Sequence, residues 1–152
     1  MTNTQFAAAP ASAVIPGPAT PYQGDIARYW DHEARPVNLR LGDVDGLYHH
    51  HYGIGDVDHA ALGDPEDSTY EKKLIAELHR LESAQTDVLL DHLGAVGTDG
   101  TLVDAGCGRG GSMVMAHQRF GCKVEGVTLS AKQAEFANGR ARDLGIGDHV
   151  RE

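Results

Sequence analysis

The sequence predicts an α/β fold built on a parallel sheet, and three observations support it. Apolar segments at residues 101–104 and 124–128 predict strands, and each is followed by a helix-like segment, at residues 111–120 and 130–143. Strands that alternate with helices form parallel sheets with right-handed crossovers. The first strand also ends in a run of glycines that opens a helix, and glycines there let a ligand approach the backbone closely.

Composition places the chain among globular proteins and excludes several classes of function. Of its 152 residues, 41% are hydrophobic and 23% are charged, and the net charge is −9. An acidic chain without an overall basic face argues against nucleic-acid partners. The chain also lacks the apolar run of roughly 20 residues that a membrane span needs. Its two cysteines, Cys107 and Cys122, predict free thiols and a cytoplasmic location.

The first part of the chain predicts little regular structure. Residues 1–20, with small side chains and repeated prolines, predict a disordered leader. A transit peptide would be rich in arginine, and none occurs before Arg28. Residues 22–35 predict a short helix. Its apolar side carries Ile26, Tyr29 and Trp30. Residues 36–67, rich in Gly, Asp and His, predict a long ordered loop, and such loops are usually functional.

The clearest helix is predicted for residues 69–93, where apolar residues recur at helical spacing. A capping box (S-x-x-E) at residues 68–71 predicts its start, and Gly94 predicts its end. A second capping box (S-x-x-Q), at residues 130–133, opens the last predicted helix. Residues 148–152 predict the approach to a third strand of the sheet.

The glycine run after the first strand, from Asp104 to Gly111, predicts a ligand site. It satisfies G-x-G-x-x-G, the dinucleotide fingerprint, so a nicotinamide-dependent oxidoreductase is one hypothesis. In dinucleotide folds, however, the useful acid lies about 20 residues later, at the end of the second strand. Here Glu125 lies within that strand, and Asp104 precedes the glycines. A tight turn without a ligand is the alternative for this loop, and a non-catalytic binding module or an inactive fragment is a third hypothesis for the chain. Cys107 predicts packing rather than a nucleophile, because no base accompanies it.

The pattern D-x-G-x-G-x-G in the same run resembles motif I of class I S-adenosylmethionine-dependent methyltransferases, whose cofactor carries an ammonium group and no pyrophosphate. The second strand and the turn after it, G-V-T-L-S-x-x-Q, resemble the cyclopropane-synthase-like branch of that family. The resemblance implies S-adenosylmethionine as the cofactor. It implies cofactor contacts at Asp104, Gly106, Gly108, Gly110, Thr128, Leu129 and Gln133. For Gln133 the capping box is an open alternative.

The resemblance also implies a Rossmann-like methyltransferase sheet of seven strands, of which this chain holds two to three. We expect residues 21–68 to form a helical and loop cap that lids substrate and cofactor. We expect residues 69–152 to form the first half of the cofactor-binding domain. Such an N-terminal fragment would leave an open sheet edge and an uncovered apolar face, so we expect it to be poorly soluble and inactive alone. The full-length protein is expected to be a homo-oligomer.

Three consecutive histidines, at residues 49–51, stand out in the predicted loop. Adjacent side chains point in different directions and no other ligands at suitable spacing accompany them, so we predict no metal site. The aromatic and histidine stretch around them, with the motifs above, resembles the actinobacterial geranyl diphosphate 2-C-methyltransferases over residues 21–152. There the stretch lids the cofactor pocket.

This closer resemblance implies methylation of carbon 2 of geranyl diphosphate, toward the terpenoid 2-methylisoborneol; methylation of another small molecule is the alternative. Tyr48 and Tyr52 are then catalytic candidates whose rings stabilise positive charge, against the alternative of ordinary loop packing. Arg35, Asn38 and Arg40 are the candidates that bind the diphosphate with its Mg²⁺, unless the arginines are simply solvated. The general base would lie beyond residue 152.

Overall fold

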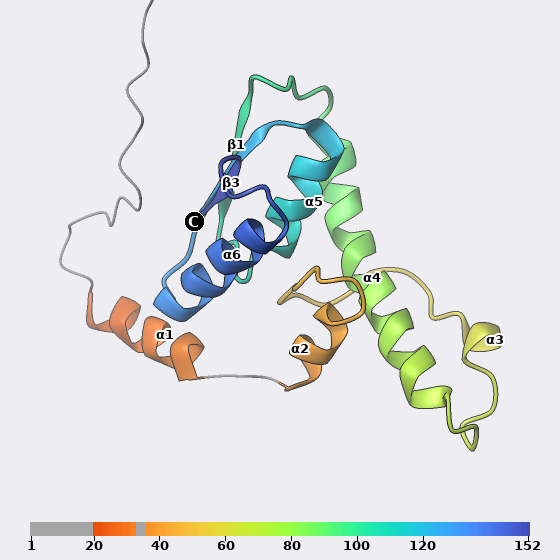
Figure 1. The fold of residues 1–152 in the computed structure, drawn as a ribbon. Coiled ribbons are helices and arrows are strands. Elements are labelled where there is room, and N and C mark those ends of the chain that lie inside the picture. Colours follow the sequence, from red (N-terminus) through yellow and green to blue (C-terminus); the bar gives the residue numbers. More distant parts are fainter. Residues whose placement is uncertain (1–19, 33–35) are drawn as a thin grey trace, which may run out of the picture.

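The computed structural model describes residues 20–32 and 36–152. Helices alone precede residue 101 in the described part of the chain, and from there on strands and helices alternate as the sequence predicts (Figure 1). The predicted leader therefore lies outside the described residues, except for Thr20 at its end. Arg35 also lies outside them. The elements are α1 (Pro21–His32), α2 (Pro36–Gly42), α3 (His59–Leu62), α4 (Tyr70–His92), β1 (Thr101–Ala105), α5 (Gly111–Phe120), β2 (Lys123–Val127), α6 (Ala131–Asp143) and β3 (Val150–Arg151).

The three strands form one parallel sheet in the order β1-β2-β3. Thr101 of β1 pairs with Lys123 of β2, and the register continues to the opposite Ala105 and Val127. The predicted α/β fold with a parallel sheet is confirmed. Because parallel strands all point the same way, the glycine loop after β1 and the turn after β2 lie at one edge of the sheet.

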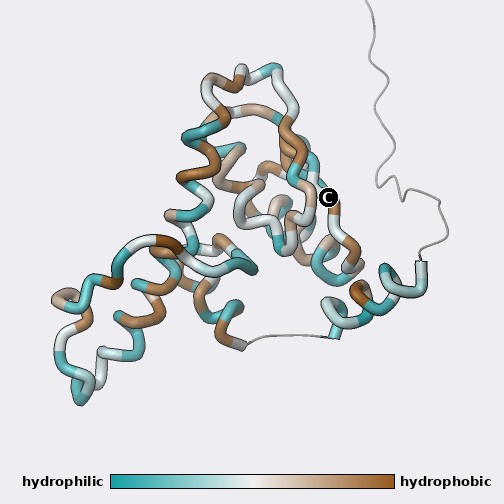
Figure 2. Tube along the Cα trace, turned by 180° about the vertical axis from the view of Figure 1, so that it is seen from behind, coloured by the Kyte–Doolittle hydropathy of each residue, from teal (hydrophilic) through white to brown (hydrophobic). Residues whose placement is uncertain are grey.

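The core lies between the sheet and the helices α4, α5 and α6. It is a cluster of buried residues: Leu90, Cys107, Met113, Ala116, Cys122, Val124, Ala141 and Val150. Hydrophobic stretches recur along α4 between hydrophilic ones (Figure 2), as expected of an amphipathic helix. Val103 and Val127 of the same sheet remain exposed. In the part of the chain that the structure describes, no helix is long and apolar enough to cross a membrane.

The start of α4 differs from the prediction, because the capping box at residues 68–71 does not form. Thr69 is the N-cap residue and its side chain makes no capping hydrogen bond. Its backbone N–H and its hydroxyl both donate to Oδ1 of Asp67, at 2.8 and 2.9 Å. Asp67 thus closes a local turn that competes with the capping box. The end of the helix is as predicted, with Gly94 at a φ of +69°.

The prediction of a long loop at residues 36–67 is also wrong in part, because this stretch contains α2 and α3. Asp58 caps α3 through its Oδ1, which accepts from the N–H of Ala61 at 3.0 Å. Leu41 at the end of α2 and Leu62 in α3 are buried, and both helices pack against α4. Helix α1 instead packs against α6 (Figure 1).

Candidate functional site

The glycine loop takes a backbone shape that only glycine adopts easily. Gly106, Gly108 and Gly110 have φ angles of +91°, +60° and +82°, which side chains with a Cβ rarely adopt. The N–H of Gly106 donates to the carbonyl of Val127 at 2.7 Å, so the loop is fixed to the end of β2. A Cβ at Gly106 would meet nothing within 4 Å. The loop is therefore held firmly while the space in front of Gly106 stays open.

That open space is part of a cavity of about 280 Å³ at the carboxyl edge of the sheet. Its lining residues are Ile26, Trp30, Gly106, Val127, Thr128, Leu129 and Gln133. Four of the seven predicted cofactor contacts thus meet in one hollow. An apolar lining with a few convergent polar groups is typical of small-molecule sites, although the volume lies at their small end.

The turn after β2 gives Gln133 two roles. Oγ of Ser130 accepts from the N–H of Gln133 at 3.1 Å, which is half of the predicted capping box. The other half does not form, because Oε1 of Gln133 accepts from the hydroxyl of Thr128 at 3.1 Å. The buried Gln133 amide is thereby held at the cavity wall.

Helix α1 contributes a wall of the cavity; the sequence analysis assigned this segment to the expected cap but named none of its residues as a site contact. Oδ1 of Asp31 accepts from the hydroxyl of Ser130 at 2.7 Å and from the N–H of Lys132 at 3.2 Å. These hydrogen bonds hold the pKa of Asp31 below its usual value. They fix α1 to the start of α6 and so place Ile26 and Trp30 at the cavity. The one-sided apolar spacing of α1 was the available signal, but it does not say what that side contacts.

Asp104 lies half-buried on β1, just before the glycine loop. Burial raises the pKa of its carboxyl, and nearby His51 opposes that rise. At Gly108 a Cβ would lie 3.7 Å from Cβ of His50. The histidine stretch therefore lies directly against the loop, and we call residues 47–55 the lid segment.

The lid segment is fixed to the start of α5 through Gly111. The N–H of Gly111 donates to the carbonyl of Tyr48 at 3.1 Å. A Cβ at this position would lie only 2.7 Å from that carbonyl oxygen and 2.8 Å from Nδ1 of His49. A glycine is required here so that the lid segment can approach.

The two candidate tyrosines differ in their surroundings. The ring of Tyr48 packs edge-on against Phe136, with centroids 4.8 Å apart, and its hydroxyl donates to Oδ1 of Asp43 at 2.7 Å. That hydrogen bond raises the pKa of Tyr48. Tyr52 is 90% exposed. Neither lines the cavity, so both stay predictions.

The diphosphate candidates that the structure describes lie on α2. Arg40 donates to Oε1 of Glu71 at 2.8 Å, and both side chains are exposed. Asn38 is half-buried on the same helix. Neither residue lines the cavity, and a ligand that bound Arg40 would compete with Glu71.

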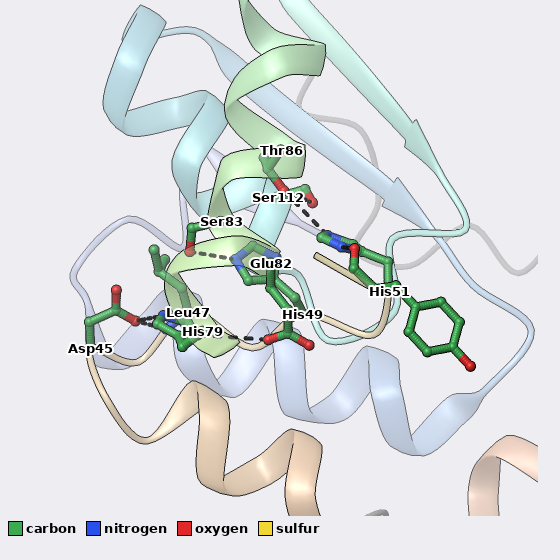
Figure 3. A network of polar contacts seen from close by, with 10 residues as sticks. Asp45, Leu47, His49, His51, His79, Glu82, Ser83, Thr86 and Ser112 are labelled. Atoms are coloured by element: carbon green, nitrogen blue, oxygen red, sulfur yellow. Dashed lines mark hydrogen bonds and ion pairs between the residues drawn. The ribbon is translucent and has the colours of Figure 1, made fainter. Parts of the chain in front are cut away.

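Beneath the lid segment, a buried polar network connects it to α4 (Figure 3). Nε2 of His79 donates to Oδ1 of Asp45 at 2.8 Å, and Nδ1 of His79 lies 3.8 Å from Oε2 of Glu82. The imidazole rings of His49 and His79 lie close together and tilted relative to each other, with their centroids 5.9 Å apart. Burial lowers the pKa of His49 to about 4 and raises the pKa of Glu82 to about 7. Among the described residues, no group of three or more His, Cys, Asp or Glu is placed to hold a metal ion.

Most of the segments that form the site lie within a stretch that matches a known protein family. Residues 46–151 match a family model described as mycolic acid cyclopropane synthetase. The chain belongs to this family. The matched residues of this family member include the lid segment, the glycine loop and the turn after β2. Helix α1 lies before the matched residues.

Two curated relatives share 77–83% of their aligned residues with this family member. Geranyl diphosphate 2-C-methyltransferase of Streptomyces ambofaciens is 83% identical over 140 residues, which are 92% of this chain and 48% of the relative. The enzyme of the same name from Streptomyces coelicolor is 77% identical over 149 residues, 98% of this chain and 51% of the relative. The chain spans about half the length of the relatives it matches.

One solved structure shows the same fold at high identity. Geranyl diphosphate C-methyltransferase from Streptomyces coelicolor A3(2), in complex with Mg²⁺, geranyl-S-thiolodiphosphate and S-adenosyl-L-homocysteine, superimposes with a TM-score of 0.87. The two sequences are 80% identical, and the superposition covers 90% of this chain and 49% of the solved chain.

Proposed function

We propose that this chain belongs to an S-adenosylmethionine-dependent methyltransferase that methylates carbon 2 of geranyl diphosphate. The cavity carries the proposal, because it gathers Gly106, Thr128, Leu129 and Gln133 at the carboxyl edge of the sheet. The relatives with 77–83% identity act on geranyl diphosphate according to their names. A solved neighbour binds S-adenosyl-L-homocysteine.

The surroundings of Glu125 favour a methyl donor over a nicotinamide cofactor. A dinucleotide fold needs an acid at the end of its second strand to hold a ribose. Here Glu125, the candidate, accepts from Arg151 of β3 at 2.5 Å, and Val127, Thr128 and Leu129 occupy the strand end. The half-buried Asp104 instead stands at the end of β1, where it can face the ammonium of an amino-acid tail.

The residues fit S-adenosylmethionine for two reasons. Gly106 has no side chain, so the space in front of its backbone is open to a ligand, and polar groups of Thr128 and Gln133 converge beside it. When bound, that cofactor supplies an electrophilic methyl group. Transfer to carbon 2 of the alkene would break the sulfur–methyl bond, leave S-adenosylhomocysteine as the thioether, and produce a tertiary cation at carbon 3. Loss of the carbon 2 proton to a general base would then restore the double bond. The chain's own residues bind, orient and exclude water, since orientation alone provides effective molarities on the order of 10⁵ M or more.

We assign the remaining candidate roles on the same basis. Tyr48 and Tyr52 offer π faces to the positive charge that develops. Arg35, Asn38 and Arg40 bind the diphosphate, which brings Mg²⁺ with it; the described residues offer no cluster that would hold the metal alone.

We also infer that the full-length protein is a cytoplasmic homo-oligomer without nucleic-acid or membrane partners. The two buried free cysteines are consistent with the cytoplasmic location. Light scattering of the purified protein tests the oligomeric state.

Isothermal titration tests the cofactor. We expect the 152-residue chain to bind S-adenosyl-L-homocysteine with micromolar affinity and to give no heat with NADH. Tight NADH binding without S-adenosyl-L-homocysteine binding would overturn the methyltransferase proposal in favour of an oxidoreductase.

A chimera tests the substrate. This chain replaces the matching half of the Streptomyces coelicolor relative, and methyl transfer to geranyl diphosphate is measured. Arg40→Ala in the chimera should raise the KM for geranyl diphosphate and leave cofactor affinity unchanged, whereas Arg28→Ala, an exposed control on α1, should change neither. A chimera that methylates a fatty acyl chain but not geranyl diphosphate contradicts the substrate assignment.

A further inference from the structure

A buried threonine of α4 lies where the lid segment and the start of α5 come together. Thr86 is 1% exposed. Its Oγ1 lies 3.2 Å from Oγ of Ser112 and 3.4 Å from Nε2 of His51 (Figure 3). Ser112 is the second residue of α5, directly after the glycine loop, and His51 belongs to the lid segment. The hydroxyl of Thr86 therefore joins three segments that are far apart in the sequence.

The partners of His51 give these hydrogen bonds a direction. Nδ1 of His51 lies 3.1 Å from the carbonyl oxygen of Tyr52, and a carbonyl only accepts, so Nδ1 carries the hydrogen. In the neutral imidazole Nε2 is then the acceptor, and Thr86 donates to it. Having donated its single proton, Thr86 accepts from the hydroxyl of Ser112. The chain of hydrogen bonds runs from Ser112 through Thr86 and His51 to the backbone of Tyr52.

A second contact holds the lid segment on the other side of Tyr52. The N–H of Ile54 donates to the carbonyl of Leu81 on α4 at 3.0 Å. Gly53 makes this approach possible, since a Cβ there would lie 2.4 Å from Cβ of Leu81. Tyr52 is thus an exposed residue held between two attachments to the same helix.

We propose that Thr86 is a positioning residue, whose hydroxyl fixes Tyr52 and the lid segment relative to the helix that follows the glycine loop. Thr86 lines no part of the cavity and acts through His51 and Ser112. The link to catalysis rests on the proposed function, in which Tyr52 faces the reacting centre. The positioning itself is a property of the chain without ligand.

Hydrogen–deuterium exchange of the lid segment tests the positioning in the 152-residue chain. Thr86→Val keeps the shape and removes the hydroxyl, so lid amides should exchange roughly threefold to tenfold faster, the factor that corresponds to one net neutral hydrogen bond. Thr86→Ser should restore exchange to within about twofold of the wild type. Thr69→Val is the matched control, an exposed threonine at the N-cap of the same helix that also loses a hydrogen bond, and it should leave lid exchange unchanged.

Lid exchange that is unchanged in Thr86→Val, or equally fast in Thr86→Val and Thr86→Ser, overturns the proposal. If Thr86→Val does not fold, His51→Phe carries the test. It removes the hydrogen bond between His51 and Thr86 from the half-buried lid side, together with the one from His51 to the carbonyl of Tyr52. Wild-type lid exchange in that variant also overturns the proposal. Titration with S-adenosyl-L-homocysteine separates the two proposals. A wild-type chain that does not bind it refutes the proposed cofactor, while the exchange measurement still decides the role of Thr86.

Discussion

Replacing Glu82 by Gln should change how the stability of this chain depends on pH. Glu82 is 4% exposed beneath the lid segment, and its Oε2 lies 3.8 Å from Nδ1 of His79. Nε2 of His79 donates to Asp45, so the neutral imidazole presents Nδ1 as an acceptor toward Glu82. A buried carboxyl in these surroundings favours its protonated form, and burial raises its pKa from 4.5 to about 7.

The magnitude follows from that shift. A carboxyl with a raised pKa in the folded state stabilises fully below pH 4.5, and this stabilisation is lost as the pH rises through 7. Between pH 5 and pH 8 the loss amounts to about 2.5 kcal/mol of unfolding free energy. His49 acts in the opposite direction, because its pKa is lowered to about 4 and acid favours its unfolded, charged form. Its stabilisation falls by about 2 kcal/mol from pH 8 to pH 5.

The two effects nearly cancel in the wild type, and Glu82→Gln should expose the His49 effect. Urea unfolding at pH 5 and pH 8, followed by the fluorescence of Trp30, measures both proteins. The stability difference between wild type and variant should change by about 2.5 kcal/mol over this range. Glu135→Gln, an exposed glutamate of α6, is the control and should follow the wild type. Parallel curves for wild type and Glu82→Gln would refute the role of burial.

Three further substitutions test the site. Gly106→Val puts a branched side chain at a φ of +91° in front of the cavity and should abolish S-adenosyl-L-homocysteine binding in titration, whereas Gly94→Val, at a φ of +69° away from the cavity, should retain it. Gly111→Ala places a Cβ 2.7 Å from the lid carbonyl and should lower the unfolding free energy by about 1–3 kcal/mol in urea. Asp31→Ala should release α1 from α6 and increase acrylamide quenching of Trp30; unchanged quenching contradicts that attachment.

The elements around the sheet follow from local sequence. The strand at residues 101–105, the helix at 111–120 and the strand after it were predicted to within a residue, because glycines and hydrophobic spacing act locally there. The start of α4 also falls within a residue of the prediction, but its predicted capping box does not form, because the N–H and the hydroxyl of Thr69 donate to Asp67 instead. Which of two local hydrogen-bond patterns forms depends on small energies that a motif does not contain.

The walls of the cavity depend on contacts between distant residues, and the sequence carries little signal for them. Asp31 and Ser130 are 99 residues apart, yet their hydrogen bond places α1. Likewise Thr86 meets His51 across 35 residues. Such pairs consist of ordinary polar residues without fixed spacing, so only the folded chain reveals them.

Gly111 explains why two different motifs matched one loop. The dinucleotide pattern needs Gly111 as its third glycine, and there this glycine serves close packing of a helix against a strand. In this fold Gly111 instead admits the lid segment, whose carbonyl accepts from its N–H and whose His49 occupies the space of a Cβ. The open space at the cavity belongs to Gly106. The third glycine therefore carries no information about a pyrophosphate, and the two patterns differ in which glycine faces the ligand.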